Sequence, residues 1–148
     1  MISSSCHCGR VRLTVLEPPP LLNECHCSVC YKYGAIWGYY SLDDVTITID
    51  GKDTPATDPA FSSTTPLSGL DLYVRDVEAE KSKDSSPGET ARGYLAFARC
   101  AHCGCMTHWV NVRPREITGE EHGLGINTRL MDQKDLDGVK RRVSEGPL

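Results

Sequence analysis

The sequence predicts a mainly β fold. Short runs rich in β-branched and aromatic residues recur along the 148 residues, and proline, glycine and charged residues separate them. Only residues 132–144 could form a helix. Hydrophobic residues make up 39% of the chain and charged residues 24%, which are ordinary values for a globular protein and argue against a disordered chain.

Seven strands are expected. Residues 10–16 (RVRLTVL) alternate polar and apolar side chains before a run of prolines. Residues 35–41 (AIWGYYS) are rich in aromatic side chains, while residues 45–50 (VTITID) alternate strictly and stop at Gly51. The other four expected strands are residues 70–75, 93–98, 107–112 and 124–131.

The remaining segments are expected to be connections. Residues 52–69, which contain Pro, Ser and Thr, and residues 76–92, which are densely charged, are predicted to be surface loops longer than the median connection. Residues 132–144 mix charges of both signs, which favours a solvated terminal segment. We therefore expect one domain over the whole chain, with the motif-bearing core at about 6–132 and a C-terminal tail at 133–148.

Charge and hydropathy argue against two classes of partner. The formal net charge of −4 provides no general attraction to nucleic acids or anionic lipids. No segment approaches the ~18 apolar residues of a membrane span, and the first residues lack the basic and apolar regions of a signal peptide. We therefore expect a soluble, cytoplasmic protein, in which cysteines are more often metal ligands or catalytic groups than disulfides.

The eight cysteines fall into three short clusters, CHCG at residues 6–9, CHCSVC at 25–30 and CAHCGC at 100–105. Scattered core cysteines do not produce such clustering, and the spacings within the clusters are those of metal ligands.

The first and last clusters are expected to share one metal. Cys100 and Cys103 have Cys-x-x-Cys spacing, and Gly104 permits the tight turn that brings two thiolates onto one Zn²⁺. Cys6 and Cys8 lie two residues apart before a strand, so an extended backbone would point both sulfurs to one face. A tetrahedral site of these four cysteines would clamp distant parts of the chain together.

The middle cluster could bind a second metal in a different way. Cys25, Cys27 and Cys30 can wrap one ion from a single turn and leave the fourth tetrahedral position for an exogenous ligand, which is the general arrangement of a catalytic zinc. Three thiolates with Zn²⁺ carry a formal charge of about −1, which makes the metal a modest Lewis acid. Such a site suits the binding and activation of another thiol.

Other interpretations of the cysteines stay open. The cysteines could be buried core residues or pair as disulfides, and Cys105 could close the middle site so that both zincs are structural. His7, His26 and His102 flank the candidate ligands, but adjacent residues rarely bind the same metal, which favours supporting or exposed roles. Direct thiol redox chemistry lacks its usual context, because the Cys-x-x-Cys motif does not lie in a strand–helix unit.

The order of these motifs, CxC, then CxCxxC, then CxxCG, resembles the glutathione-dependent formaldehyde-activating family, also called the Gfa-like or centromere protein V family. The resemblance covers about residues 6–132 and implies a β-tent fold, in which zinc joins antiparallel strands. It also implies a structural zinc on Cys6, Cys8, Cys100 and Cys103 and an active-site zinc on the catalytic cluster of Cys25, Cys27 and Cys30.

The activity that the resemblance implies is that of a carbon–sulfur lyase. The family's name reaction adds glutathione to formaldehyde and gives S-(hydroxymethyl)glutathione, which implies glutathione as a co-substrate. We therefore expect a thiol, in the first place glutathione, to add to or leave formaldehyde or another small carbonyl-type electrophile at a tricysteinyl zinc. The alternative is a non-catalytic, zinc-stabilised binding module in which both zinc sites are closed.

Two groups of side chains are candidates for a thiol-substrate pocket. Glutathione carries two carboxylates, which need cationic or amide donors at a fixed distance from the metal. Aromatic rings beside the middle cluster could form pocket walls. The candidates are the donors Lys32, Arg99, Asn127 and Arg129 and the rings of Tyr33 and Trp37. No nucleic-acid or membrane partner is expected, and homo-oligomerisation is left open.

Overall fold

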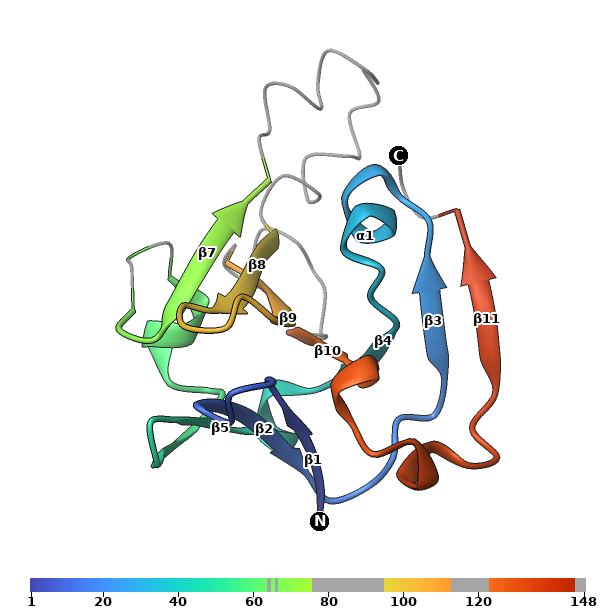
Figure 1. The fold of residues 1–148 in the computed structure, drawn as a ribbon, viewed down its shortest axis with the longest axis horizontal. Helices are drawn as coiled ribbons and strands as arrows, with labels where there is room; N and C mark the ends of the chain where they lie inside the picture. The colour runs from blue at the N-terminus through green and yellow to red at the C-terminus, as the bar shows by residue number, and fades with distance from the viewer. Residues whose placement is uncertain (64, 66, 76–94, 113–122, 146–148) are drawn as a thin grey trace.

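In the part of the chain that the structure describes, two β-sheets and one short α-helix build the fold (Figure 1). The computed structural model describes residues 1–63, 65, 67–75, 95–112 and 123–145. The helix, α1, spans Ser28–Tyr33, and no helix among the described residues is long and apolar enough to cross a membrane. The strands are β1 (Ile2–Ser5), β2 (Val11–Val15), β3 (Leu22–Cys25), β4 (Trp37–Tyr40), β5 (Thr46–Ile49), β6 (Lys52–Pro55), β7 (Leu70–Val74), β8 (Leu95–Cys100), β9 (Met106–Asn111), β10 (Leu124–Asn127) and β11 (Arg141–Ser144).

The predicted mainly β class is confirmed. Neighbouring strands in both sheets are antiparallel, except that β11 runs parallel to β3. The seven-stranded sheet has the order β11-β3-β4-β10-β9-β8-β7, and in Figure 1 it runs from β11 and β3 on the right to β7 on the left. The four-stranded sheet, β1-β2-β5-β6, lies below it in the same view.

The main core lies between the two sheets. In β2 the buried side chains of Val11, Leu13 and Val15 alternate with more exposed ones, as the sequence pattern predicts. They belong to the same hydrophobic cluster as Val110 and Ile126 of the seven-stranded sheet. Each sheet thus buries one apolar face against the other, and the cysteine-rich turns lie at the ends of the strands.

All seven predicted strands are present, with their ends shifted by a few residues. The strand expected at 93–98 starts at Leu95 among the described residues and continues to Cys100. The strand expected at 124–131 ends at Asn127, because a 3₁₀ turn over Thr128–Leu130 follows at once.

Two expectations about the connections are wrong. Residues 52–69 are not one loop, because β6 pairs with β5 and a 3₁₀ turn over Pro59–Ser62 follows. The expectation that only residues 132–144 could form a helix is wrong as well, because the α-helix lies at Ser28–Tyr33. Residues 132–144, expected as a solvated terminal segment, form a 3₁₀ turn over Gln133–Leu136, then Gly138 with a left-handed φ of 79°, and then β11, which pairs with β3. Both extra strands are short and mostly exposed, so backbone pairing and not an apolar pattern specifies them. The loop expected at 76–92 lies outside the described residues.

Close packing between β9 and β10 requires glycine at one position. Gly125 lies opposite Trp109 in the strand register. A Cβ atom on Gly125 would lie 2.2 Å from the indole Nε1 atom, a distance that real Cβ contacts do not show. The indole therefore packs directly on the β10 backbone, which only a residue without a side chain permits.

Gly125→Ala should lower the free energy of unfolding by about 1–3 kcal/mol, because the added methyl group overpacks the contact with the indole. Urea unfolding of the wild type and of the variant measures this change. The control is the double variant Gly125→Ala/Trp109→Ala, whose loss should be smaller than the sum of the two single losses, since the clashing ring is gone. Additive losses would show that the glycine does not act through Trp109.

Candidate metal centres and the adjoining pocket

Four cysteine side chains from the two sheets meet in one cluster, which we call the four-cysteine cluster: Cys6, Cys8, Cys100 and Cys103. Their Sγ atoms all lie within 4.8 Å of one another. The Sγ atom of Cys8 lies 3.6 Å from that of Cys6 and 3.6 Å from that of Cys100. A tetrahedral zinc with bonds of about 2.3 Å to sulfur separates its sulfur ligands by about 3.8 Å, so the donor type and the spacing both fit Zn²⁺.

A turn between β1 and β2 brings the first two of these cysteines together. The amide of Gly9, which has a φ of 83°, donates to the carbonyl of Cys6 at 3.1 Å. The amide of Val11 donates to the Cys6 Sγ atom at 3.3 Å. The prediction of an extended backbone around Cys6 and Cys8 is therefore wrong, and a tight turn aligns the two sulfurs instead.

The turn between β8 and β9 is built in the same way. The amide of Cys103 donates to the Cys100 Sγ atom at 3.5 Å, and the amide of Gly104 donates to the Cys100 carbonyl at 2.9 Å. Gly104 has a φ of 79°, as the expected tight turn requires. Amide groups directed at sulfur favour the thiolate form, which is the form that binds metal.

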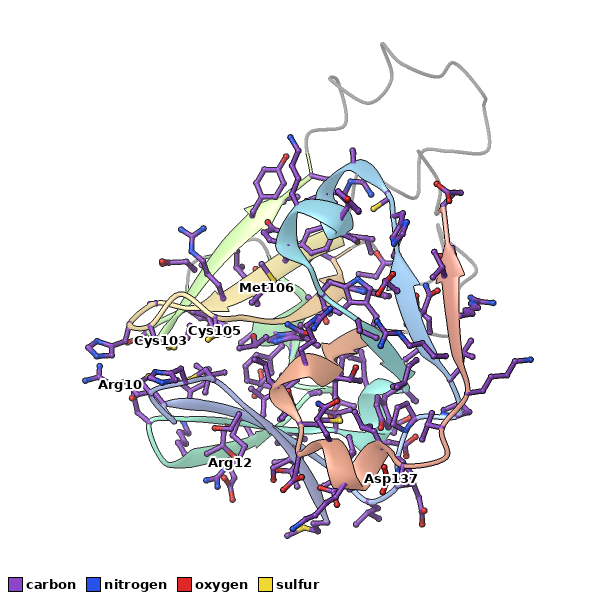
Figure 2. The ribbon with its side chains drawn as sticks, turned by 45° about the vertical axis from the view of Figure 1, so that its right-hand side comes forward. Arg10, Arg12, Cys103, Cys105, Met106 and Asp137 are labelled. Carbon is purple, nitrogen blue, oxygen red and sulfur yellow. The ribbon has the colours of Figure 1, made fainter. Side chains whose placement is uncertain are left out.

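Because the two turns belong to different sheets, the four-cysteine cluster joins the sheets at one end. Figure 2 shows Cys103 in the β8–β9 turn, close to Arg10 in the turn before β2. Cys105 follows in the same β8–β9 turn, where its carbonyl accepts a hydrogen bond from the amide of Cys100 at 2.9 Å. Its thiol interacts with that of Cys103, and it does not join the middle cysteines.

Cys25, Cys27 and Cys30 form the second group, the three-cysteine cluster. Cys25 ends β3, Cys27 caps the N-terminus of α1, and Cys30 lies in the first turn of α1. The amide of Cys30 donates to the Cys27 Sγ atom at 3.5 Å. Each of the three residues is less than one-tenth exposed. Among the described residues, no histidine, carboxylate or further cysteine completes this group.

Contacts among the three thiols shift their pKa values in opposite directions. Hydrogen bonds from the thiols of Cys25 and Cys30 lower the pKa of Cys27 to about 2, while the contacts with Cys25 and Cys27 raise the pKa of Cys30 far above its ordinary value. A divalent cation between the three sulfurs would allow all of them to ionise. The donor set therefore fits a zinc ion with three protein ligands.

Aromatic side chains pack against the three-cysteine cluster on its inner side. Trp37 is 1% exposed, and its ring centroid lies 6.2 Å from that of Phe97. The ring centroid of Tyr33 lies 5.4 Å from that of Phe97, and all three rings belong to the same apolar group as the cysteines. This apolar backing lowers the local dielectric constant and strengthens any charge interaction at the sulfurs.

On its outer side the three-cysteine cluster borders a pocket of about 190 Å³. The pocket is lined by Glu24, Cys25, His26, Cys30, Tyr31, Gly34, Ala35 and Arg129. A small molecule in this pocket would therefore contact two of the three cysteines directly.

The acidic side chain of the pocket is held in a fixed network. The Glu24 carboxylate binds the Arg141 guanidinium at 2.5 Å and the His26 Nε2 atom at 2.9 Å. The hydrogen bond from Arg141 lowers the pKa of the Glu24 carboxyl group most, and the hydrogen bond with His26 lowers it further. The amide of His26 also donates to the Ser144 carbonyl at 2.7 Å, so β11 supports this wall of the pocket from behind.

Of the six residues expected in a thiol-substrate pocket, Arg129 is among those that line this one. Lys32 is exposed on the last turn of α1. Arg99 is half-exposed on β8 and pairs with Asp71 at 3.6 Å. Neither of these two cations lines the pocket.

The other three candidates support the site and do not line the pocket. Trp37 and Tyr33 belong to the aromatic packing beneath the cysteines. Asn127 is buried, donates from Nδ2 to the Met106 carbonyl at 2.9 Å, and accepts at Oδ1 from the Arg129 amide at 3.2 Å. His108, another polar residue near the last cysteine motif, is 2% exposed, and burial lowers its pKa to about 4, so it is a neutral core residue.

Comparisons with known proteins give a partial match in sequence and a match in fold. No family model matches the chain. A protein of Halomonas elongata, provisionally named a glutathione-dependent formaldehyde-activating enzyme, is 39% identical over 57 residues, which are 36% of this chain and 36% of that protein. The match thus spans about a third of the length of this curated relative.

A crystal structure of a Rhodobacter sphaeroides protein superposes with a TM-score of 0.53. The alignment covers 95% of this chain and 99% of that chain, at 21% sequence identity. At this identity the likeness shows that the two chains share a fold.

Cys103→Ser should abolish cooperative folding, whereas Cys105→Ser, in the same turn but outside the four-cysteine cluster, should fold like the wild type. A structural zinc contributes about 10–16 kcal/mol of apparent binding free energy, which is comparable with the whole stability of a domain. Thermal unfolding and zinc content per chain measure the effect, and we expect two zinc equivalents in the wild type and in Cys105→Ser. Equal behaviour of the two variants would contradict the assignment of the cluster.

Proposed function

We propose that the chain is a zinc-dependent carbon–sulfur lyase of the Gfa-like kind. In this proposal the four-cysteine cluster holds a structural zinc and the three-cysteine cluster holds a reactive one. The enzyme adds a thiol, in the first place glutathione, to formaldehyde or another small carbonyl-type electrophile, or catalyses the reverse elimination. The observation that carries the proposal is a group of three cysteines that borders a pocket and has no fourth protein ligand among the described residues.

The partial relative supports the same chemistry. The Halomonas elongata protein is named for glutathione-dependent formaldehyde activation, and it matches about a third of this chain. Thiolate ligands and glutathione both need a reducing setting, so the proposal also places the protein in the cytoplasm.

In this proposal the cysteines and the pocket have different roles in the reaction. Cys25, Cys27 and Cys30 would hold the zinc, which when bound lowers the pKa of a thiol at its open position. In the reaction a bond forms between the thiol sulfur and the carbonyl carbon, and the thiol proton passes to the carbonyl oxygen. The pocket brings these two atoms together, and this proximity supplies much of the acceleration.

The pocket walls suit a small electrophile beside a larger thiol. Gly34 and Ala35 leave space close to the sulfurs of Cys25 and Cys30. The Glu24 carboxylate is occupied by Arg141 and His26, so it keeps the His26 ring in place on that wall. The aromatic packing behind the cysteines keeps water away from their inner side.

The alternative, a binding module with both zinc sites closed, loses its main support. That hypothesis required Cys105 or a histidine to complete the middle site. Among the described residues neither joins Cys25, Cys27 and Cys30, and Cys105 lies in the β8–β9 turn, beside the four-cysteine cluster but not part of it.

Cys30→Ser should reduce catalysis of the glutathione–formaldehyde reaction to the uncatalysed background, because the reactive metal loses one of its three ligands. Exchange NMR between free and hydroxymethylated glutathione measures the rate in both directions. The chain should stay folded, with zinc content falling from two equivalents to about one.

Cys105→Ser is the matched control, since it also removes one thiol but should retain full activity. A wild-type protein with two bound zinc ions that does not accelerate the exchange would overturn the formaldehyde reaction. Retained activity in Cys30→Ser would show that the three-cysteine cluster is not the reactive site.

A further inference from the structure

Arg129 is held in the wall of the pocket from two directions. It lies in the 3₁₀ turn Thr128–Leu130, directly after β10. Its Nε atom donates to the Gly34 carbonyl at the end of α1, at 2.6 Å. Its backbone amide donates to the Asn127 side chain at 3.2 Å. The first bond anchors the Nε atom beside the helix that contains Cys30 and that Gly34 caps, and the second fixes the Arg129 backbone.

The bond to Gly34 uses one of the five N–H donors of the guanidinium. The two terminal nitrogens keep the planar, forked geometry that matches a carboxylate. In the described part of the chain, no carboxylate lies within ion-pair distance of Arg129, whereas Arg141 pairs with Glu24 and Arg99 pairs with Asp71.

Arg129 lines the pocket and has no carboxylate partner among the described residues, so its guanidinium can bind an anionic ligand. The carboxylate of Glu24 is already bound by Arg141 and His26. Arg129 is exposed at the pocket, so an incoming molecule can reach it from solvent. A charge-assisted, bidentate contact is the strongest interaction that such a group offers to a small anion.

We infer that Arg129 binds a carboxylate of the thiol substrate and makes the pocket selective for carboxylate-bearing thiols. The position of the sulfur at the three-cysteine cluster rests on the proposed function, but the contact between Arg129 and a carboxylate does not. The inference can therefore be tested with a molecule that has the carboxylates and lacks a free thiol.

S-methylglutathione is this probe, and its dimethyl ester is the matched ligand without carboxylates. Isothermal titration of the zinc-loaded wild type should show that esterification weakens binding at least about ten-fold. Arg129→Gln should weaken binding of S-methylglutathione by a similar factor and leave binding of the ester unchanged. Arg12→Gln, which changes an exposed arginine of β2 in the other sheet, should behave like the wild type.

Arg129→Lys separates charge from geometry, because it keeps the positive charge and loses the fork. It should bind S-methylglutathione more weakly than the wild type and more tightly than Arg129→Gln. Zinc content and thermal unfolding confirm that each variant is folded, and the comparison of acid with ester in the wild type needs no variant.

Three results would overturn the inference: no binding of S-methylglutathione by the wild type at millimolar concentration, equal affinity of the wild type for acid and ester, or equal loss of both ligands in Arg129→Gln. Failure of the proposed function is read separately, from glutathione–formaldehyde exchange. A protein that binds S-methylglutathione through Arg129 but does not catalyse exchange would retain the carboxylate site and lose the lyase proposal.

Discussion

The approach of four thiols from two sheets is the contact on which the rest of the structure depends. Cys6 and Cys8 lie at one end of the four-stranded sheet, and Cys100 and Cys103 lie at one end of the seven-stranded sheet. Sulfur atoms that lie 3.6 Å apart are stable neighbours when they are ligands of one metal ion. Four thiolates at such distances without a cation between them would repel one another. A metal ion bound at this point would therefore stabilise the packing of the two sheets as well as the cluster itself.

The two cysteine clusters differ in their surroundings more than in their chemistry. The four-cysteine cluster lies between two tight turns that direct backbone amides at its sulfurs. The three-cysteine cluster has an aromatic core on one side and a pocket on the other. The same ligand type thus occurs as a group of four in one place and as a group of three beside a pocket in the other, and ligand number is what separates a closed metal site from one with an open position.

The sequence predicted those strands and turns that are specified by residues close together in the chain. Strict alternation in β2 and β5 identifies strands, and Cys-x-x-Cys-Gly spacing identifies a metal-binding turn. The pocket could not be predicted in this way, because its walls come from β3, α1 and the turn after β10. Asn127 illustrates the difference: its polar side chain was a candidate for binding a ligand, but it satisfies the backbone of Met106 and Arg129. Likewise, nothing in the charged sequence of β11 indicates that it pairs with β3.

The parallel pairing of β11 with β3 has a consequence for biosynthesis. Glu24 leaves the ribosome 117 residues before Arg141, with which its side chain forms a hydrogen bond. Pairing of β3 with β11 across this separation closes a long loop, which is slow compared with the formation of a hairpin. The wall of the pocket that contains Glu24 and His26 is therefore completed only after Arg141 and Ser144 have been translated.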